Sequence, residues 1–189
     1  MPPVDLTTMQ IADLPVFFAG DAKGSGVLHE AADEGHIAGL NAVSSELHSF
    51  KRRTPLAIVF ADPNVAVVGK PFATLNKSTT LIGEVSFAHQ GRARTAQHNK
   101  EVMRIYAERE SGLLLGAEMC APAAEHMAHT LALAIERSLN VRDLLRMPFY
   151  HPVLEEGMRT ALRDLASQLP KCSDSALAGC PAYNVEALD

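Results

Sequence analysis

The chain has 189 residues, of which 47% are hydrophobic and 21% charged, and its net charge is −5. Such a composition is typical of a folded globular protein, and the length suffices for one complete domain and part of another. The negative charge argues against a nucleic-acid-binding surface, and no apolar run approaches the roughly 18 residues of a membrane span. We therefore expect neither nucleic acid nor a membrane as a partner. The N-terminus lacks the pattern of a secretory signal, and so we expect a cytoplasmic protein.

The first 52 residues are predicted to form one β-turn-α unit. An apolar run from Leu14 to Ala22 indicates a buried strand that ends in a Gly-Asp turn. A helix is predicted from Leu28, and Gly35 and Gly39 fall on one of its faces, which predicts that another backbone or a ligand approaches there. Because one β-α unit cannot close a sheet, residues 1–52 are interpreted as the end of a larger α/β domain.

Antiparallel strands are predicted next, over residues 53–121. Strands are expected at Leu56–Phe60, after the Asp-Pro turn at 62–63, in "TTLIGEVSFAH", and as a hairpin in "EVMRIYAERESGLLLGAEMCA" with its turn at 110–112. Three helices should follow, the first with Pro122 in its first turn, the second capped by Asn140 and the third beginning at Pro152. Strands followed by helices predict an α+β fold, an antiparallel sheet with helices on one face over residues 53–169. Residues 170–189 are expected to be a flexible tail.

The stretch "YHPVLEEG" places a titratable ring at the expected start of the third helix. Pro152 suits a first helical position, which puts His151 at the cap. The side chain of Glu156, five residues on, can lean back toward the imidazole. A carboxylate on one ring nitrogen would leave the other nitrogen free to act as a base. The alternative is that His151 is only a cap and Glu156 only a first-turn acid favoured by the helix dipole.

Four segments, in order, resemble the C-terminal part of the flavin-dependent pyridine nucleotide-disulfide oxidoreductases. They are "VFFAGD", "PLAIVFADPNVAVVG", "SGLLLGAEMCAPAAEHMAHTLALAI" and "HPVLEEG", and the resemblance is greatest to the dihydrolipoamide dehydrogenases. It extends from about Val4 to about Leu169. The resemblance implies that residues 1–52 are a remnant of the FAD-binding domain and that residues 53–169 are the interface domain, which pairs with a second copy to form a homodimer.

The resemblance also implies site residues and cofactors. Gly20 and Asp21 would bind the ribityl hydroxyls of FAD, and His29 would lie near the pyrimidine edge of the flavin. His151 and Glu156 would serve the partner's active site, where His151 exchanges a proton with the thiol of a dithiol substrate. Such a base is needed because only the thiolate attacks a disulfide. NAD or NADP would be the co-substrate, bound by a domain that this chain does not contain.

Several departures from the family pattern bear on activity. The redox cysteine pair, which the family spaces by four residues, is absent, since seven residues separate Cys172 from Cys180. "GSGVLH" has His29 where a GxGxxG motif has its third glycine. Phe149 and Val153 stand where dihydrolipoamide dehydrogenases commonly have histidine and threonine. We expect the isolated chain to be inactive by itself, and the alternative function is a stand-alone, non-catalytic dimerisation module.

Two further features allow other interpretations. His126 and His129 are spaced for a metal site on a helix, but structural zinc usually needs four ligands and no cluster completes the set. We therefore expect an exposed helix face and no metal. A disulfide between Cys172 and Cys180 is not expected, because the cytosol keeps such thiols reduced.

Overall fold

The computed structural model describes residues 3–23 and 26–170. The chain divides into two compact units, Met1–Arg53 and Thr54–Asp189. The predicted tail and the two cysteines at positions 172 and 180 lie outside the described residues.

In residues 3–23 and 26–53, the first unit contains a helix but no continuous strand. The predicted helix is confirmed as α1, Leu28–Val43, and a short 3-10 helix, η1, covers Gly20–Lys23. The predicted buried strand over residues 14–22 is wrong, because its first residues are exposed and only Phe17 forms a bridge, to Gln10. A strand is stabilised by the ladder that it forms with a neighbour, and the described part of this unit supplies only isolated bridges.

The expected close approach to the glycines of α1 is also not found. Within the described residues, no atom outside the helix lies within 4 Å of a Cβ built on Gly35 or on Gly39. Both glycines are exposed to solvent.

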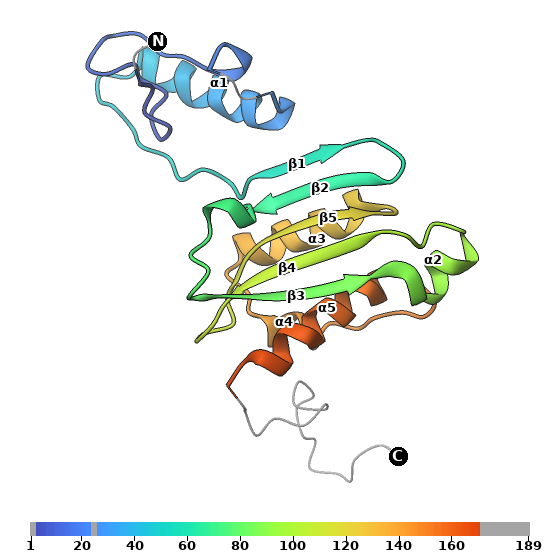
Figure 1. Cartoon of the computed structure of the whole chain (residues 1–189). Coiled ribbons are helices and arrows are strands. Elements are labelled where there is room, and N and C mark those ends of the chain that lie inside the picture. The colour runs from blue at the N-terminus through green and yellow to red at the C-terminus, as the bar shows by residue number, and fades with distance from the viewer. Residues whose placement is uncertain (1–2, 24–25, 171–189) are drawn as a thin grey trace, which may run out of the picture. The chain divides into compact units, whose positions relative to one another are not determined.

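The second unit is built on a five-stranded antiparallel sheet, as predicted (Figure 1). Its strands are β1 (Leu56–Val59), β2 (Asn64–Gly69), β3 (Thr80–Ser86), β4 (Val102–Glu108) and β5 (Leu114–Ala121). They lie in the order β1-β2-β5-β4-β3, and every neighbouring pair is antiparallel. The predicted hairpin is the β4–β5 pair.

Helices cover one face of this sheet (Figure 1). They are α3 (Ala124–Glu136), α4 (Val141–Leu145) and α5 (Glu155–Gln168), while η2 (Phe72–Thr74), η3 (Phe87–His89) and α2 (Gly91–Thr95) are short connections. The fold class is therefore the predicted α+β layer. The Asn140 cap is confirmed, since its side chain accepts the N–H groups of Arg142 and Asp143.

Two predicted helix starts are wrong. The first helix is capped by Ala123, so Pro122 precedes it and does not belong to its first turn. The third begins at Glu155, three residues after Pro152. Two residues before α5, side chains bind both backbone groups of Val153, because Glu156 accepts its N–H and Gln90 donates to its carbonyl. His151 therefore lies in a turn and does not cap the helix.

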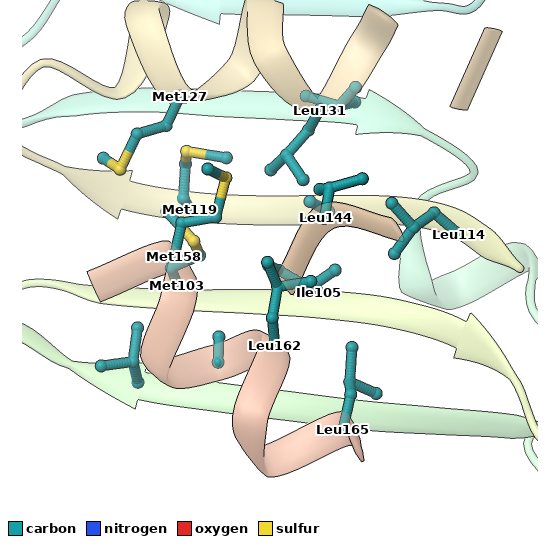
Figure 2. Packing of buried hydrophobic residues seen from close by; sticks show 14 of the residues in the cluster. Met103, Ile105, Leu114, Met119, Met127, Leu131, Leu144, Met158, Leu162 and Leu165 are labelled. Carbon is teal, nitrogen blue, oxygen red and sulfur yellow. The ribbon is translucent and has the colours of Figure 1, made fainter. Parts of the chain in front are cut away.

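The core fills the space between the sheet and its helices (Figure 2). Alternate residues of β4 and β5 point into it and meet the apolar faces of α3 and α5; the large members are Met103, Ile105, Met119, Met127, Leu131, Met158, Leu162 and Leu165. Burial of each such side chain contributes about 1.5–3 kcal/mol. The helix α5 packs directly on β3 at Gly83, where a Cβ would lie 2.2 Å from the carbonyl oxygen of Ala161. Among the helices that the structure describes, none is both long and apolar enough to cross a bilayer.

Candidate functional site

The loop that leads into α5 brings His151 and Glu156 together. The imidazole Nδ1 lies 2.9 Å from Oε1 and 3.0 Å from Oε2 of the carboxylate. The side chain of His151 is 78% exposed, whereas that of Glu156 is 27% exposed. The ring thus extends into solvent, and the group that orients it lies partly within the fold.

This geometry fixes the proton on the ring. A carboxylate only accepts hydrogen bonds, so a neutral His151 that bonds it carries its proton on Nδ1. Nε2 then holds a lone pair, and it has no bonding partner among the described residues. The hydrogen bond from His151 is the main cause that holds the pKa of Glu156 below its ordinary value, and the Val153 N–H acts in the same direction. Glu156 is therefore charged at neutral pH.

The pair lies at a surface cavity of about 300 Å³. Polar side chains of β3, η3, α5 and the segments beside them line it; they include Ser86, His89, Gln90, His151, Glu156 and Thr160. Sequence reasoning missed His89 and Gln90, because nothing local connects Gln90 to a carbonyl 63 residues away. The cavity is open to solvent at the surface.

The start of α5, which carries Glu156, is fixed by a close helix–ring contact. A Cβ on Gly157 would lie 2.6 Å from Cε1 of Phe87, a ring that is fully buried. Only glycine at this position allows the first turn of α5 to come so close. On the other side of the loop, the guanidinium of Arg159 lies 5.5 Å from the centre of the Phe149 ring.

In the first unit, Gly20 and Asp21 lie at a turn that Glu34 supports. Gly20 has φ of +69°, which favours glycine, and its N–H donates to Oε2 of Glu34 over 2.8 Å. The carboxylate of Glu34 is buried and also accepts a hydrogen bond from Arg52 at 3.2 Å. Asp21 itself is exposed. Sequence reasoning missed Glu34 and Arg52, since a carboxylate within a polar helix carries no signal of burial.

The start of α1 carries the third predicted cofactor-binding residue, His29. His29 lies exposed in the first turn, and the N-cap Val27 provides no side-chain hydrogen bond. The first N–H groups of the helix, which no helical carbonyl can accept, therefore receive no hydrogen bond from the side chain of the cap residue.

The histidines of α3 show no metal-like grouping. His126 and His129 are both exposed, and each interacts with Glu125, His126 through the carboxylate and His129 through the carbonyl oxygen. In residues 3–23 and 26–170, no three or more His, Cys, Asp or Glu side chains come together as metal ligands could.

Comparison with known proteins identifies the second unit. Residues 56–162 match the dimerisation domain of the pyridine nucleotide-disulphide oxidoreductases. The chain belongs to this family. The resemblance inferred from the four sequence segments is therefore confirmed, and residues 56–162 form a dihydrolipoyl dehydrogenase-like dimerisation domain of a flavoprotein disulfide oxidoreductase.

Individual relatives match a longer part of the chain than the family domain does. The chain is 32% identical over 142 residues to a dihydrolipoyl dehydrogenase of Haloferax volcanii, covering 74% of this chain and 30% of the relative. It is 30% identical over 149 residues to the mitochondrial dihydrolipoyl dehydrogenase of Rattus norvegicus, covering 77% and 29%. The chain thus spans about a third of the length of these relatives.

Solved structures agree with this assignment. LpdA of Mycobacterium tuberculosis superimposes with a TM-score of 0.71 and 25% identity, over 86% of this chain and 36% of LpdA. The flavoprotein disulfide reductase RclA of Escherichia coli superimposes with a TM-score of 0.67 over 87% of this chain and 38% of RclA. At 20% identity, RclA supports the fold alone.

Proposed function

We propose that this chain is the C-terminal portion of an FAD-dependent, dihydrolipoyl dehydrogenase-like disulfide oxidoreductase. In this role it supplies the homodimer interface and a proton-transfer pair, His151 and Glu156, for dithiol/disulfide exchange with NAD or NADP as co-substrate. One observation carries the proposal. Within a domain of this family, an exposed imidazole has its Nδ1 bound by a carboxylate at 2.9 Å, which leaves Nε2 available to substrate.

The chemistry of thiols explains why such a pair is useful. A free thiol has a pKa of about 8.5 and is mostly protonated at neutral pH, yet only its thiolate attacks a disulfide. Nε2 of His151 accepts the thiol proton, and the charge of Glu156 stabilises the imidazolium that results. In the reverse direction, the same ring returns the proton to the departing sulfur. The pair therefore exchanges a proton and does not form a covalent bond.

Part of a flavin site fits residues of the first unit. The exposed carboxylate of Asp21, held at a turn by the Gly20–Glu34 hydrogen bond, suits an acceptor for ribityl hydroxyls. At the start of α1, the cap residue Val27 makes no side-chain hydrogen bond and His29 lies in the first turn. This end of the helix suits the electron-rich edge of the flavin ring. FAD, when bound, would carry two electrons between the dithiol and the nicotinamide. We propose these three residues, Gly20, Asp21 and His29, as cofactor-binding residues.

A chimera tests the catalytic role. In it, residues 4–169 of this chain replace the matching C-terminal part of the Haloferax volcanii relative, and oxidation of dihydrolipoamide is followed through NADH formation. General acid–base catalysis typically contributes a factor of about 10²–10⁴, so His151→Gln should lower kcat by roughly a hundredfold or more. Glu156→Gln should lower it less, and His129→Gln, at an exposed histidine of α3, should not change it.

The outcomes separate the two candidate functions. Flavin content and dimerisation of each chimera are measured first, so that a loss of assembly is not mistaken for a loss of catalysis. An assembled chimera whose rate is unaffected by His151→Gln would refute the proton-transfer role. An assembled but inert chimera, together with self-association of the 189-residue chain, would favour the non-catalytic dimerisation module.

A further inference from the structure

We propose that Gln90 is a positioning residue for the His151–Glu156 pair; this inference rests on the proposed function. The side-chain amide of Gln90 is bonded at both ends. Its Nε2 donates to the carbonyl oxygen of Val153 over 2.6 Å, and its Oε1 accepts the N–H of Ala93 over 2.6 Å. Gln90 also lines the cavity that contains His151 and Glu156.

The peptide groups of Val153 connect Gln90 to the pair. The carbonyl of Val153 receives the amide of Gln90, while its N–H donates to Oε2 of Glu156 over 3.3 Å. The same carboxylate binds Nδ1 of His151. A continuous chain of hydrogen bonds therefore runs from Gln90 through the Val153 backbone and Glu156 to the imidazole. Residues 151–154 precede the first turn of α5, and within them the N–H and the carbonyl of Val153 are both bonded to side chains.

Gln90 is itself held rigidly enough to act as an anchor. It is the N-cap of α2, and its backbone N–H donates to the carbonyl oxygen of Phe87 over 3.0 Å. Phe87 is fully buried and contacts the start of α5 at Gly157. The anchor and the helix that carries Glu156 thus both meet Phe87, the anchor at its backbone carbonyl and the helix at its ring, while the imidazole that they orient is exposed.

The consequence is control of the His151 tautomer. An exposed imidazole is free to rotate, and its hydrogen bond to a partly exposed carboxylate is weakened by competition with water. If the Val153 carbonyl loses the amide of Gln90, the loop is free to shift and the Nδ1–Glu156 bond is populated less. The Nδ1–H tautomer then declines, and with it the fraction of rings whose Nε2 is ready to accept a proton.

The test is ¹⁵N NMR of the histidine rings in the full 189-residue chain at a pH where His151 is neutral. The His151 signals are assigned by their loss in His151→Gln. Gln90→Ala removes both side-chain bonds, whereas Gln90→Glu keeps an acceptor for Ala93 and removes the donor to Val153. The matched control is Gln168→Ala at the other end of α5. It removes a hydrogen bond of the same kind, from the side-chain amide of Gln168 to the Ile82 carbonyl over 2.8 Å.

We expect both Gln90 variants to lower the ratio of the Nδ1–H to the Nε2–H tautomer by roughly three- to tenfold, the effect of losing one ordinary hydrogen bond. Gln168→Ala should leave the ratio unchanged. An unchanged ratio in Gln90→Glu, or an equal fall in the Gln168 control, overturns the proposal. The proposed function is judged separately in the chimera. A tautomer shift without any change of kcat in Gln90→Glu would retain the positioning role and reject the catalytic one.

Discussion

The contact between Gly157 and Phe87 allows a sharp test of how the start of α5 is held. Gly157→Ala has two opposing effects on the free energy of unfolding. Alanine in a helix is favoured over glycine by up to about 1 kcal/mol. Against this, the new Cβ would lie 2.6 Å from Cε1 and 2.8 Å from Cζ of Phe87, closer than carbon atoms approach.

The steric effect should dominate. Phe87 has 0% of its surface exposed, so its ring cannot turn away into solvent. Overpacking of a well-packed core typically costs about 1–3 kcal/mol. Because the ring is fully buried, we expect a cost in the upper part of this range, about 2–3 kcal/mol, and so a net loss of about 1–2 kcal/mol. If α5 retreats from the ring, Glu156 moves with it, the hydrogen bond to His151 weakens, and the pKa of Glu156 rises toward its ordinary value.

Urea unfolding followed by tyrosine fluorescence measures this loss. The tyrosines are Tyr106, Tyr150 and Tyr183, all outside the first unit, so the signal is specific to the second. With a slope of about 2 kcal/mol per M urea, the middle of the usual range, the midpoint should fall by roughly 0.5–1 M.

The control is Gly39→Ala in α1, where no atom of the described residues outside the helix lies within 4 Å of the new Cβ. It should raise the stability of that helix, measured by far-UV circular dichroism, because only the propensity effect remains. A Gly157→Ala midpoint equal to or above that of the parent would refute the argument from the Phe87 contact.

Three further predictions concern the same unit. Gly83→Ala places a Cβ 2.2 Å from the Ala161 carbonyl oxygen, a backbone atom, and should cost at least about 2–3 kcal/mol in urea unfolding; a smaller loss than for Gly157→Ala would contradict this. Asn140→Ala removes the capping box of α4 and should cost about 1 kcal/mol, with Asn140→Asp as the near-neutral control. The folded-state pKa of Glu156 is lowered, so its ionised carboxylate contributes to the free energy of unfolding, by no more than about 1 kcal/mol. This contribution is present above pH 4.5 and is lost as the pH falls through the folded-state pKa. The stability difference between the parent and Glu156→Gln should therefore shrink in acid, and a difference that grows there would contradict the lowered pKa.

The sheet could be predicted because its strands carry their own signals. In β4, Met103 and Ile105 are buried while Val102 and Arg104 are exposed, and this alternation reports the inner face directly. The cap at Asn140 is equally local, since its partners are two and three residues away. Both features depend on interactions between residues close together in the chain, and so the residue types and their spacing suffice to predict them.

The errors arose where distant parts of the chain decide the structure. The apolar run at 14–22 has the composition of a strand, but the described part of its unit provides no continuous ladder for it. Pro152 has the right residue type for a helix start, yet the Gln90 and Glu156 side chains bind the backbone of Val153 and delay α5 to Glu155. No sequence pattern connects Gln90 with Val153.

The exposure of the pair bears on where its substrate comes from. A base that served a thiol within its own domain would gain from burial beside that thiol. His151 is instead 78% exposed, and the elements that orient it lie beneath it in the fold. Its Nε2 is therefore exposed to solvent, and we propose that the thiol is supplied by another domain or chain. In a dimerisation domain, the natural source is the partner subunit, which supports the proposal that each chain completes the dithiol site of its partner. Dimer formation and proton transfer would then depend on the same surface.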